Sequence, residues 1–419
     1  MTRTERQQEA VKKWLNNKGK GSFEFPTGFG KTRSALTAFK AVLKKYPSLR
    51  ILIVVPTETL KTQWIEQLDE HGISFNAEVQ IINTVVKHKW NCDLLCIDEI
   101  HRVASELFHK VFECVNYKLI LGLTATFNRL DGKQVLISKY CPIIDKVSLL
   151  ECQVNGWISE YKEYQVLLDV DDIDEYKKYN REWIEHFEFF GFDFNKAMSC
   201  VGPEGWKTKL RLRNELYTGN DENKKKQVLQ GINYHAAGFV RTMQKRKAFI
   251  NNHPKKIEIA KKIMEARPDV KIITFSNNVK MAEAIENGNY VYTGKTAKKK
   301  GRVMVEDFLT GKINHLHSCH KLNEGFDAPD ASVGIILGTD SSETKARQRR
   351  GRVIRKYGDK RAEIFYLIIN DTIESKWFKN SHQNDMDYLT IDEKGLEQVL
   401  NGEQPELYKG KIKELKFRF

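Results

Sequence analysis

The sequence predicts an α/β protein with two tandem parallel-sheet domains and a helical insertion in the second domain. Its 419 residues are long for one hydrophobic core and suit two domains. Short, nearly unbroken apolar runs form two groups along the chain, at 51–55, 94–97 and 119–123, and then at 271–276, 289–294, 333–338 and 363–369. Such runs are typical of strands that helices cover on both faces of a parallel sheet.

The domain boundaries follow from a change in composition between the two groups of strands. Residues 172–250 are polar, aromatic and charge-dense with helical periodicity, which indicates a helical insertion. We therefore expect a first domain over 1–152, a second domain over 153–380 that contains the insertion, and a basic C-terminal tail over 381–419. The insertion's aromatic residues could form a wedge or thumb for nucleic acid, but we favour the simpler interpretation that they build its own core: Trp183, Phe187, Phe189 and Phe190.

Charge and composition indicate the class of partner. The formal net charge of +14 suits a protein that neutralises phosphates, although a merely soluble basic surface would carry the same charge. No apolar run approaches the ~20 residues needed to span a bilayer, and the N-terminal ten residues lack the apolar core of a signal peptide. We expect a cytoplasmic protein, at a nucleoid or viral replication site, with reduced and mostly buried cysteines.

A phosphate-binding loop is predicted at residues 25–32, FPTGFGKT, between a short apolar run and an amphipathic helix. Phe25 stands where the usual pattern has its first glycine. Gly28 and Gly30 give the backbone freedom to approach phosphate oxygens, Lys31 would bridge the terminal phosphates, and Thr32 would hold Mg²⁺. The remaining loop residues that we expect around the nucleotide are Pro26, Thr27 and Phe29.

Two neighbouring carboxylates complete the chemistry expected of such a loop. Asp98 and Glu99 follow the apolar run of LLCIDEIHR, so they lie at the C-terminal end of a strand, where open parallel sheets bind ligands. Asp98 would help to hold Mg²⁺, and Glu99 would orient or deprotonate the attacking water. Two solvated acids at a strand end are the alternative, which the upstream Gly-Lys-Thr disfavours.

These motifs together bring a family into view. PTGFGKT and DEIH resemble motifs I and II of the superfamily 2 helicases. Further stretches resemble other motifs of that family in the expected order: RQQEAVKKW the glutamine motif, VVPTETLKTQW motif Ia, LTATFNR motif III, EGFDAP motif V and QRRGRVIR motif VI. GLTATFNRLDG is most similar to the branch that contains XPB and UvsW. The resemblance implies two RecA-like domains with ATP between them.

The resemblance also assigns roles to individual residues. It implies that Gln7 reads the adenine edge and that Arg6 can stack on the ring. It places ribose contacts at Glu324, Gly325 and Asp327, and coupling residues at His101, Thr124 and Thr126.

Motif VI is expected to supply cations from the second domain. Arg352 and Arg355 lie three residues apart, so on a helix both would face the γ-phosphate, while Gln348 could touch the attacking water or His101. A cationic solvated helix is the alternative.

Nucleic-acid contacts are expected on the opposite face from the nucleotide. The candidates are Pro56, Thr57, Thr84, Ser276, Asn277 and His320. Hydroxyl, amide and backbone groups bind phosphates without reading bases, although each of these residues could equally be a cap or turn residue. The second Gly-Lys-Thr, at 294–296, lacks the earlier glycine and an acidic strand end, so we expect no second nucleotide site there.

The expected function is that of an ATP- and Mg²⁺-dependent DNA helicase or translocase acting as a monomer. By resemblance it would move 3′ to 5′ and unwind or branch-migrate forked or branched DNA in replication, recombination or repair. Single-stranded and branched DNA are the expected partners rather than RNA, and no membrane is expected. An RNA helicase and an ATP-gated duplex-DNA translocase or remodeller without strand separation are the alternatives.

Overall fold

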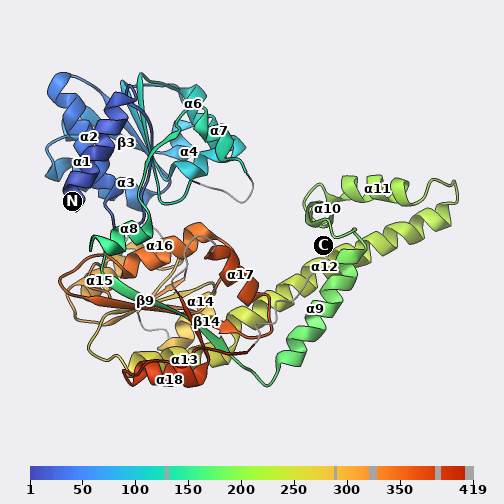
Figure 1. Cartoon of the computed structure of the whole chain (residues 1–419). Coiled ribbons are helices and arrows are strands. Elements are labelled where there is room, and N and C mark those ends of the chain that lie inside the picture. The colour runs from blue at the N-terminus through green and yellow to red at the C-terminus, as the bar shows by residue number, and fades with distance from the viewer. Residues whose placement is uncertain (128–131, 287–289, 320–327, 383–387, 411–419) are drawn as a thin grey trace.

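The computed structural model describes the chain apart from residues 128–131, 287–289, 320–327, 383–387 and 411–419. The described residues form two lobes, each centred on a parallel sheet, and a helical arm that projects from the second lobe (Figure 1). The predicted α/β class with two parallel-sheet domains is confirmed. No helix in the described ranges is long and apolar enough to cross a bilayer.

The first lobe surrounds a six-stranded sheet with the order β3-β2-β5-β7-β1-β8. Its strands are β1 (Lys20–Glu24), β2 (Ile51–Val55), β3 (Ala77–Ile81), β5 (Leu94–Asp98), β7 (Leu119–Thr124) and β8 (Ile143–Lys146), and β4 (Trp90–Asn91) pairs separately with β6 (Val115–Asn116). The helices are α1 (Arg3–Asn16), α2 (Lys31–Lys45), α3 (Glu58–Glu70), α4 (Ile82–Val85), α5 (Glu106–His109), α6 (Val111–Cys114) and α7 (Gln134–Ser138), with 3-10 turns η1 (Ser74–Asn76) and η2 (Ile100–Ala104).

Strand register positions the chemistry of this lobe. Glu24 lies opposite Thr124, and Asp98 lies opposite Leu123, so the C-terminal ends of β1, β5 and β7 meet at one edge of the sheet. Every residue of β2 and β5 is buried, which explains why both read as unbroken apolar runs in the sequence. The edge where the strands end faces the second lobe.

The second lobe contains a seven-stranded parallel sheet with the order β11-β12-β10-β13-β14-β9-β15. Its strands are β9 (Glu160–Leu168), β10 (Ile272–Ser276), β11 (Val291–Tyr292), β12 (His315–Cys319), β13 (Val333–Ile336), β14 (Arg361–Ile369) and β15 (Leu389–Ile391). Helix α8 (Leu149–Val154) leads into the lobe, whose helices are α13 (Pro254–Glu265), α14 (Val279–Ile285), α15 (Lys298–Leu309), α16 (Glu343–Val353), α17 (Glu374–Ser381) and α18 (Glu393–Leu400).

The arm between β9 and α13 is the expected helical insertion. It consists of α9 (Ile173–Glu188), α10 (Phe194–Ser199), α11 (Gly205–Leu216) and the 31-residue α12 (Glu222–Asn252), and α9 lies along α12 (Figure 1). Trp183, Phe187 and Phe190 are buried together in the arm, and Phe189 stacks on His235 with 4.2 Å between ring centroids. The interpretation that these aromatics build the arm's own core is therefore confirmed.

Two details differ from the expectation. The predicted basic tail at 381–419 is not a separate unit over its described part, because β15 pairs with β9 and α18 buries Leu396 and Val399 against the second lobe. Five strands of the two main sheets have no counterpart among the predicted apolar runs: β3, β8, β9, β12 and β15. The seven cysteines are free thiols, and all except Cys114 are buried, as expected.

Candidate functional site

The loop between β1 and α2 has the backbone geometry of a phosphate cradle. Gly28 and Gly30 have φ values of 95° and 100°, a region that side chains with a Cβ avoid. The ring of Phe25 is fully buried and packs against Phe23 and Phe29, with centroids 5.1 and 4.9 Å away. Phe25 therefore fills the core behind the loop, which leaves the loop's backbone open to the cleft.

Gln7 of α1 supports this loop through a hydrogen bond to its backbone. Its buried side-chain amide donates a hydrogen bond to the Phe29 carbonyl at 2.7 Å. A Cβ on Gly30 would lie 2.6 Å from the Gln7 Nε2 atom and would displace this amide, while the φ of 100° makes glycine the favoured residue there. In this structure Gln7 braces the loop, and its contact with adenine stays a prediction.

Arg6 has a different environment from the one expected. Its guanidinium is buried and donates to Asp145 at 2.5 Å and to Glu151 at 3.1 Å. These two carboxylates hold the side chain beneath β8, so it does not face the cleft as a stacking partner. The sequence could not reveal this, because Asp145 and Glu151 lie about 140 residues away along the chain.

Asp98 and Glu99 lie side by side at the end of β5. Asp98 accepts hydrogen bonds from the Trp64 indole N–H and from the Glu99 backbone N–H, both at 3.0 Å. Burial and the neighbouring Glu99 charge raise the pKa of Asp98. Burial also opposes ionisation of Glu99, but the hydrogen bond with His101, 3.3 Å away, and the charge of Lys31 outweigh it and lower the pKa of Glu99. Glu99 is thus held as a carboxylate.

Lys31, the first residue of α2, lies opposite the two acids. Its Nζ atom donates to the Phe25 carbonyl at 3.4 Å, and the side chain is half-buried in the lining of the cleft. Burial lowers the pKa of Lys31, while Glu99 and Asp98 act against that shift. A phosphate placed between the loop and this lysine would meet a cation in a poorly hydrated site, where electrostatic attraction is strong.

Motif VI reaches the same cleft from the second lobe, but not wholly on a helix. Helix α16 ends at Val353, so Arg355 lies beyond it and the argument that a helix aligns both arginines is wrong. The Ser159 hydroxyl donates to the Arg355 carbonyl at 2.9 Å and draws this segment toward β9. Burial lowers the pKa of Arg355 to about 10, so the guanidinium stays charged at neutral pH.

These groups line one cleft of about 550 Å³ between the lobes. That volume is typical of a site for a nucleotide-sized ligand. Its lining includes ten residues expected from the sequence: Thr27, Gly28, Gly30, Lys31, Thr32, Asp98, Glu99, Gln348, Arg352 and Arg355. The Thr32 hydroxyl and the Asp98 carboxylate provide the hard oxygen donors that Mg²⁺ prefers.

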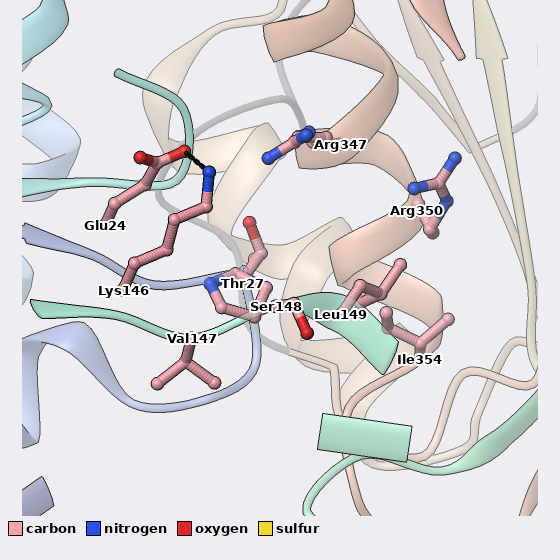
Figure 2. A pocket seen from close by; sticks show the side chains of 10 residues that line it. Glu24, Thr27, Lys146, Val147, Ser148, Leu149, Arg347, Arg350 and Ile354 are labelled. Carbon is pink, nitrogen blue, oxygen red and sulfur yellow. Dashed lines mark ion pairs between the residues drawn. The ribbon is translucent and has the colours of Figure 1, made fainter. Parts of the chain in front are cut away.

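A second cavity of about 260 Å³ lies beside this cleft along the seam between the lobes. Figure 2 shows Glu24 paired with Lys146 on the wall from the first lobe, and Arg347 and Arg350 of α16 on the other side. Pro26 lines this cavity and not the nucleotide cleft. Thr27 lines both, because α16 approaches it so closely that a Cβ on Gly351 would overlap the Thr27 side chain.

Comparison with known proteins finds related helicases. Residues 1–91 and 77–129 match the family described as type III restriction enzyme, res subunit, and residues 255–357 match the helicase conserved C-terminal domain. The DNA 3′-5′ translocase XPB2 of Sulfurisphaera tokodaii is 28% identical over 387 residues, which cover 88% of this chain and 82% of that protein. These similarities support an XPB-like superfamily 2 helicase.

Two further similarities place this helicase among its relatives. The helicase domain of Pyrococcus furiosus Hef has the same two-lobed fold, with a TM-score of 0.51 at 17% identity, over 90% of this chain and 97% of that one. A protein of African swine fever virus, QP509L, named as an ATP-dependent RNA helicase, is 29% identical over 188 residues. That match covers 38% of this helicase and 36% of the viral protein.

Several residues of the helicase that were predicted to contact nucleic acid have local structural roles. The Thr57 hydroxyl caps α3 by accepting from the Leu60 N–H at 3.3 Å, and Thr84 is exposed on α4. Ser276 is buried with its hydroxyl donating to the Asn278 carbonyl, which does not support the expected side-chain contact with a strand. The expected contacts of Pro56 and Asn277 with nucleic acid stay predictions. Four predicted residues lie outside the described part of the chain: His320, Glu324, Gly325 and Asp327.

Sequence reasoning missed several residues that line the cleft of the helicase. Trp64 is the most informative, because its N–H reaches the Asp98 carboxylate from α3. A tryptophan on the inner face of an amphipathic helix needs a partner for its N–H when it is buried, and that need was the available signal. The others are Arg3, Arg33, Leu60, Gln63, Glu66, Gln67, Pro329 and Lys356.

Proposed function

We propose that this protein is an ATP-dependent DNA translocase and helicase that hydrolyses ATP between its two lobes. The observation that supports this most strongly is the single cleft lined by Lys31, Asp98 and Glu99 of one lobe and Arg352 and Arg355 of the other. One chain supplies both halves of the cleft, which favours a monomeric enzyme. ATP hydrolysis measured with and without DNA tests the proposal, and a rate that DNA does not change would contradict it.

Each group in the cleft has a role in the proposed mechanism. The loop amides and Lys31 bind the β- and γ-phosphates, and Glu99 positions the attacking water and accepts its proton. Mg²⁺ held by Thr32 and Asp98 would neutralise phosphate charge when bound. Arg352 and Arg355 stabilise the charge that develops on the γ-phosphate. Because both come from the second lobe, they reach the phosphate only when the lobes are closed, so hydrolysis depends on closure.

DNA is the proposed track, with movement 3′ to 5′, as the name of XPB2 suggests. The similarity to QP509L, named as an RNA helicase, favours RNA as a second candidate over part of the chain. ATPase stimulation by matched DNA and RNA strands separates the two. Strand displacement on forked, four-way and blunt DNA then distinguishes unwinding from translocation, because turnover without displacement would indicate a duplex translocase or remodeller.

Binding to DNA is expected to weaken steeply with salt. The net charge of +14 supports a large electrostatic contribution, and exposed aromatics of the arm, Phe194, Trp206 and Tyr234, could stack on bases. If six to ten phosphates are contacted, affinity should fall by roughly 10³–10⁵ between 50 and 200 mM salt. Fluorescence anisotropy with labelled single-stranded DNA measures this, and a flat response would exclude the proposed phosphate contacts.

Replacing Trp64 by phenylalanine is expected to weaken the use of Mg²⁺. The ring can still pack beside Phe39, but the hydrogen bond that orients Asp98 is lost. Removing such a supporting partner typically costs about 10- to 100-fold in metal affinity. The Mg²⁺ concentration for half-maximal ATPase rate should rise accordingly. Trp90→Phe is the control, because the Trp90 N–H has no hydrogen-bond partner within the described structure; equal Mg²⁺ curves for both variants would disprove the role of Trp64.

A further inference from the structure

Helix α16 touches the first lobe at two points on one helical face. Gly351 packs directly on Thr27 of the phosphate loop. One turn earlier, the Arg347 Nη1 atom donates a hydrogen bond to the Ala125 carbonyl at 3.0 Å. Residues four apart lie on the same side of a helix, so both contacts form together when the lobes close.

The Ala125 peptide is connected to the catalytic carboxylate of Glu99 through buried hydrogen bonds. The flanking Thr124 hydroxyl donates to the Thr126 carbonyl at 2.8 Å and accepts from the Thr126 N–H at 3.1 Å. His101 Nδ1 lies 3.0 Å from the Thr124 hydroxyl and 3.3 Å from the Glu99 carboxylate. His101, Thr124 and Thr126 are all less than 10% exposed. A displacement of Ala125 would therefore change the position of the Glu99 carboxylate through Thr124 and His101.

Arg347 is held ready for this contact by its own helix. Its Nη2 atom donates to Glu343 at 2.5 Å, one turn earlier on α16, and both side chains are less than 20% exposed. Arg347 lines the cavity beside the nucleotide cleft and extends from α16 toward the Glu24–Lys146 pair (Figure 2). Unlike Arg352, it is not among the residues that line the nucleotide cleft.

We propose that Arg347 is a positioning residue that signals closure of the lobes to Glu99 through Ala125, Thr124 and His101. This inference rests on the proposed function of the cleft. With the lobes closed, Arg347 fixes the Ala125 peptide, and the Thr124–His101 contact keeps Glu99 oriented toward water. With the lobes apart, Ala125 loses this donor, and Glu99 loses its orientation. Hydrolysis is thereby restricted to the closed state.

The test separates nucleotide binding from turnover in the full-length protein. Arg347→Ala should lower the DNA-stimulated kcat about tenfold or more, as expected for one charge-assisted hydrogen bond, while the Kd for a fluorescent ADP stays within about twofold. Energy transfer between dyes at Lys44→Cys in α2 and Lys261→Cys in α13 should report reduced closure with a non-hydrolysable ATP analogue. Arg347→Lys can reach one partner but not both, so it should lie between wild type and Arg347→Ala.

The control is Lys345→Ala on the same helix. Lys345 pairs with Asp340 inside the second lobe, 2.8 Å away, and should leave kcat, Kd and closure unchanged. Thermal melting of each variant establishes that it is folded. Wild-type kcat and closure in Arg347→Ala, or an equal loss in Lys345→Ala, would overturn the inference. Absence of DNA-stimulated ATPase in the wild type would instead overturn the proposed function.

Discussion

Replacing Lys31 by alanine should reduce ATP hydrolysis by about 10²–10³-fold or more, while DNA binding persists. The ammonium lies in the poorly hydrated cleft opposite Asp98 and Glu99, where it would bridge the terminal phosphates. Without it, the cleft loses the ammonium that would offset the charge of the transferred phosphoryl group. Steady-state ATPase assays with saturating DNA measure the loss, and anisotropy measures DNA binding.

Lys40→Ala provides a matched control for this prediction. Lys40 lies on the same helix but is exposed to solvent, so its removal should leave the rate within about twofold. Comparable loss in both variants would point to a general effect on α2. Full activity of Lys31→Ala would remove the basis for the nucleotide site.

Arg352→Ala is expected to lower turnover by about 10³–10⁵-fold, the range found for arginine fingers. Arg352 is 8% exposed and reaches the cleft from the last turn of α16, so it would stabilise charge that develops only during hydrolysis. ATP affinity should therefore change far less than kcat. Arg352→Lys should recover little activity, because an ammonium cannot reproduce the planar, two-point contact.

Single-turnover hydrolysis with saturating DNA distinguishes this result from impaired product release. Arg361→Ala is the control, since Arg361 is an exposed arginine of the same lobe that pairs with Glu160 at 3.2 Å and is not among the residues that line the cleft. A loss confined to ATP affinity in Arg352→Ala would show that the arginine binds the ground state and does not act as a finger.

The nucleotide side of the site could be predicted because its signals are local. Glycines, lysine and threonine of the loop follow one strand, and Asp98 and Glu99 end another, so strand–loop–helix order was enough to bring them together. Arg6 could not be placed, since its partners come from β8 and α8. The position of Arg355 also depended on distant structure, because contacts with Ser159 accompany the end of α16.

Two of the strands that escaped prediction, β9 and β12, carry polar residues that are paired inside the lobe. Glu163 of β9 is buried and pairs with Arg350 at 2.9 Å. Burial by itself would raise the pKa of Glu163, but the charge of Arg350 and the hydrogen bond with His382 outweigh it and lower this pKa to about 2. In β12, His317 is fully buried beside the Thr274 hydroxyl at 2.9 Å. Charged and imidazole side chains in a sequence usually indicate surface positions, but here each is buried with a hydrogen-bond or ion-pair partner.

The length of α12 has a mechanical consequence. Its 31 residues make a rigid rod of about 46 Å at about 1.5 Å per residue. The base of the arm is fixed to the second lobe, where the Tyr176 hydroxyl of α9 accepts from the Ile373 N–H at 3.0 Å. Within the arm, the Arg246 guanidinium of α12 lies 4.2 Å from the Trp183 ring centroid of α9. Such a rod acts as a lever: a lobe rotation of about 10° would sweep its far end through about 8 Å, more than the spacing of two stacked base pairs.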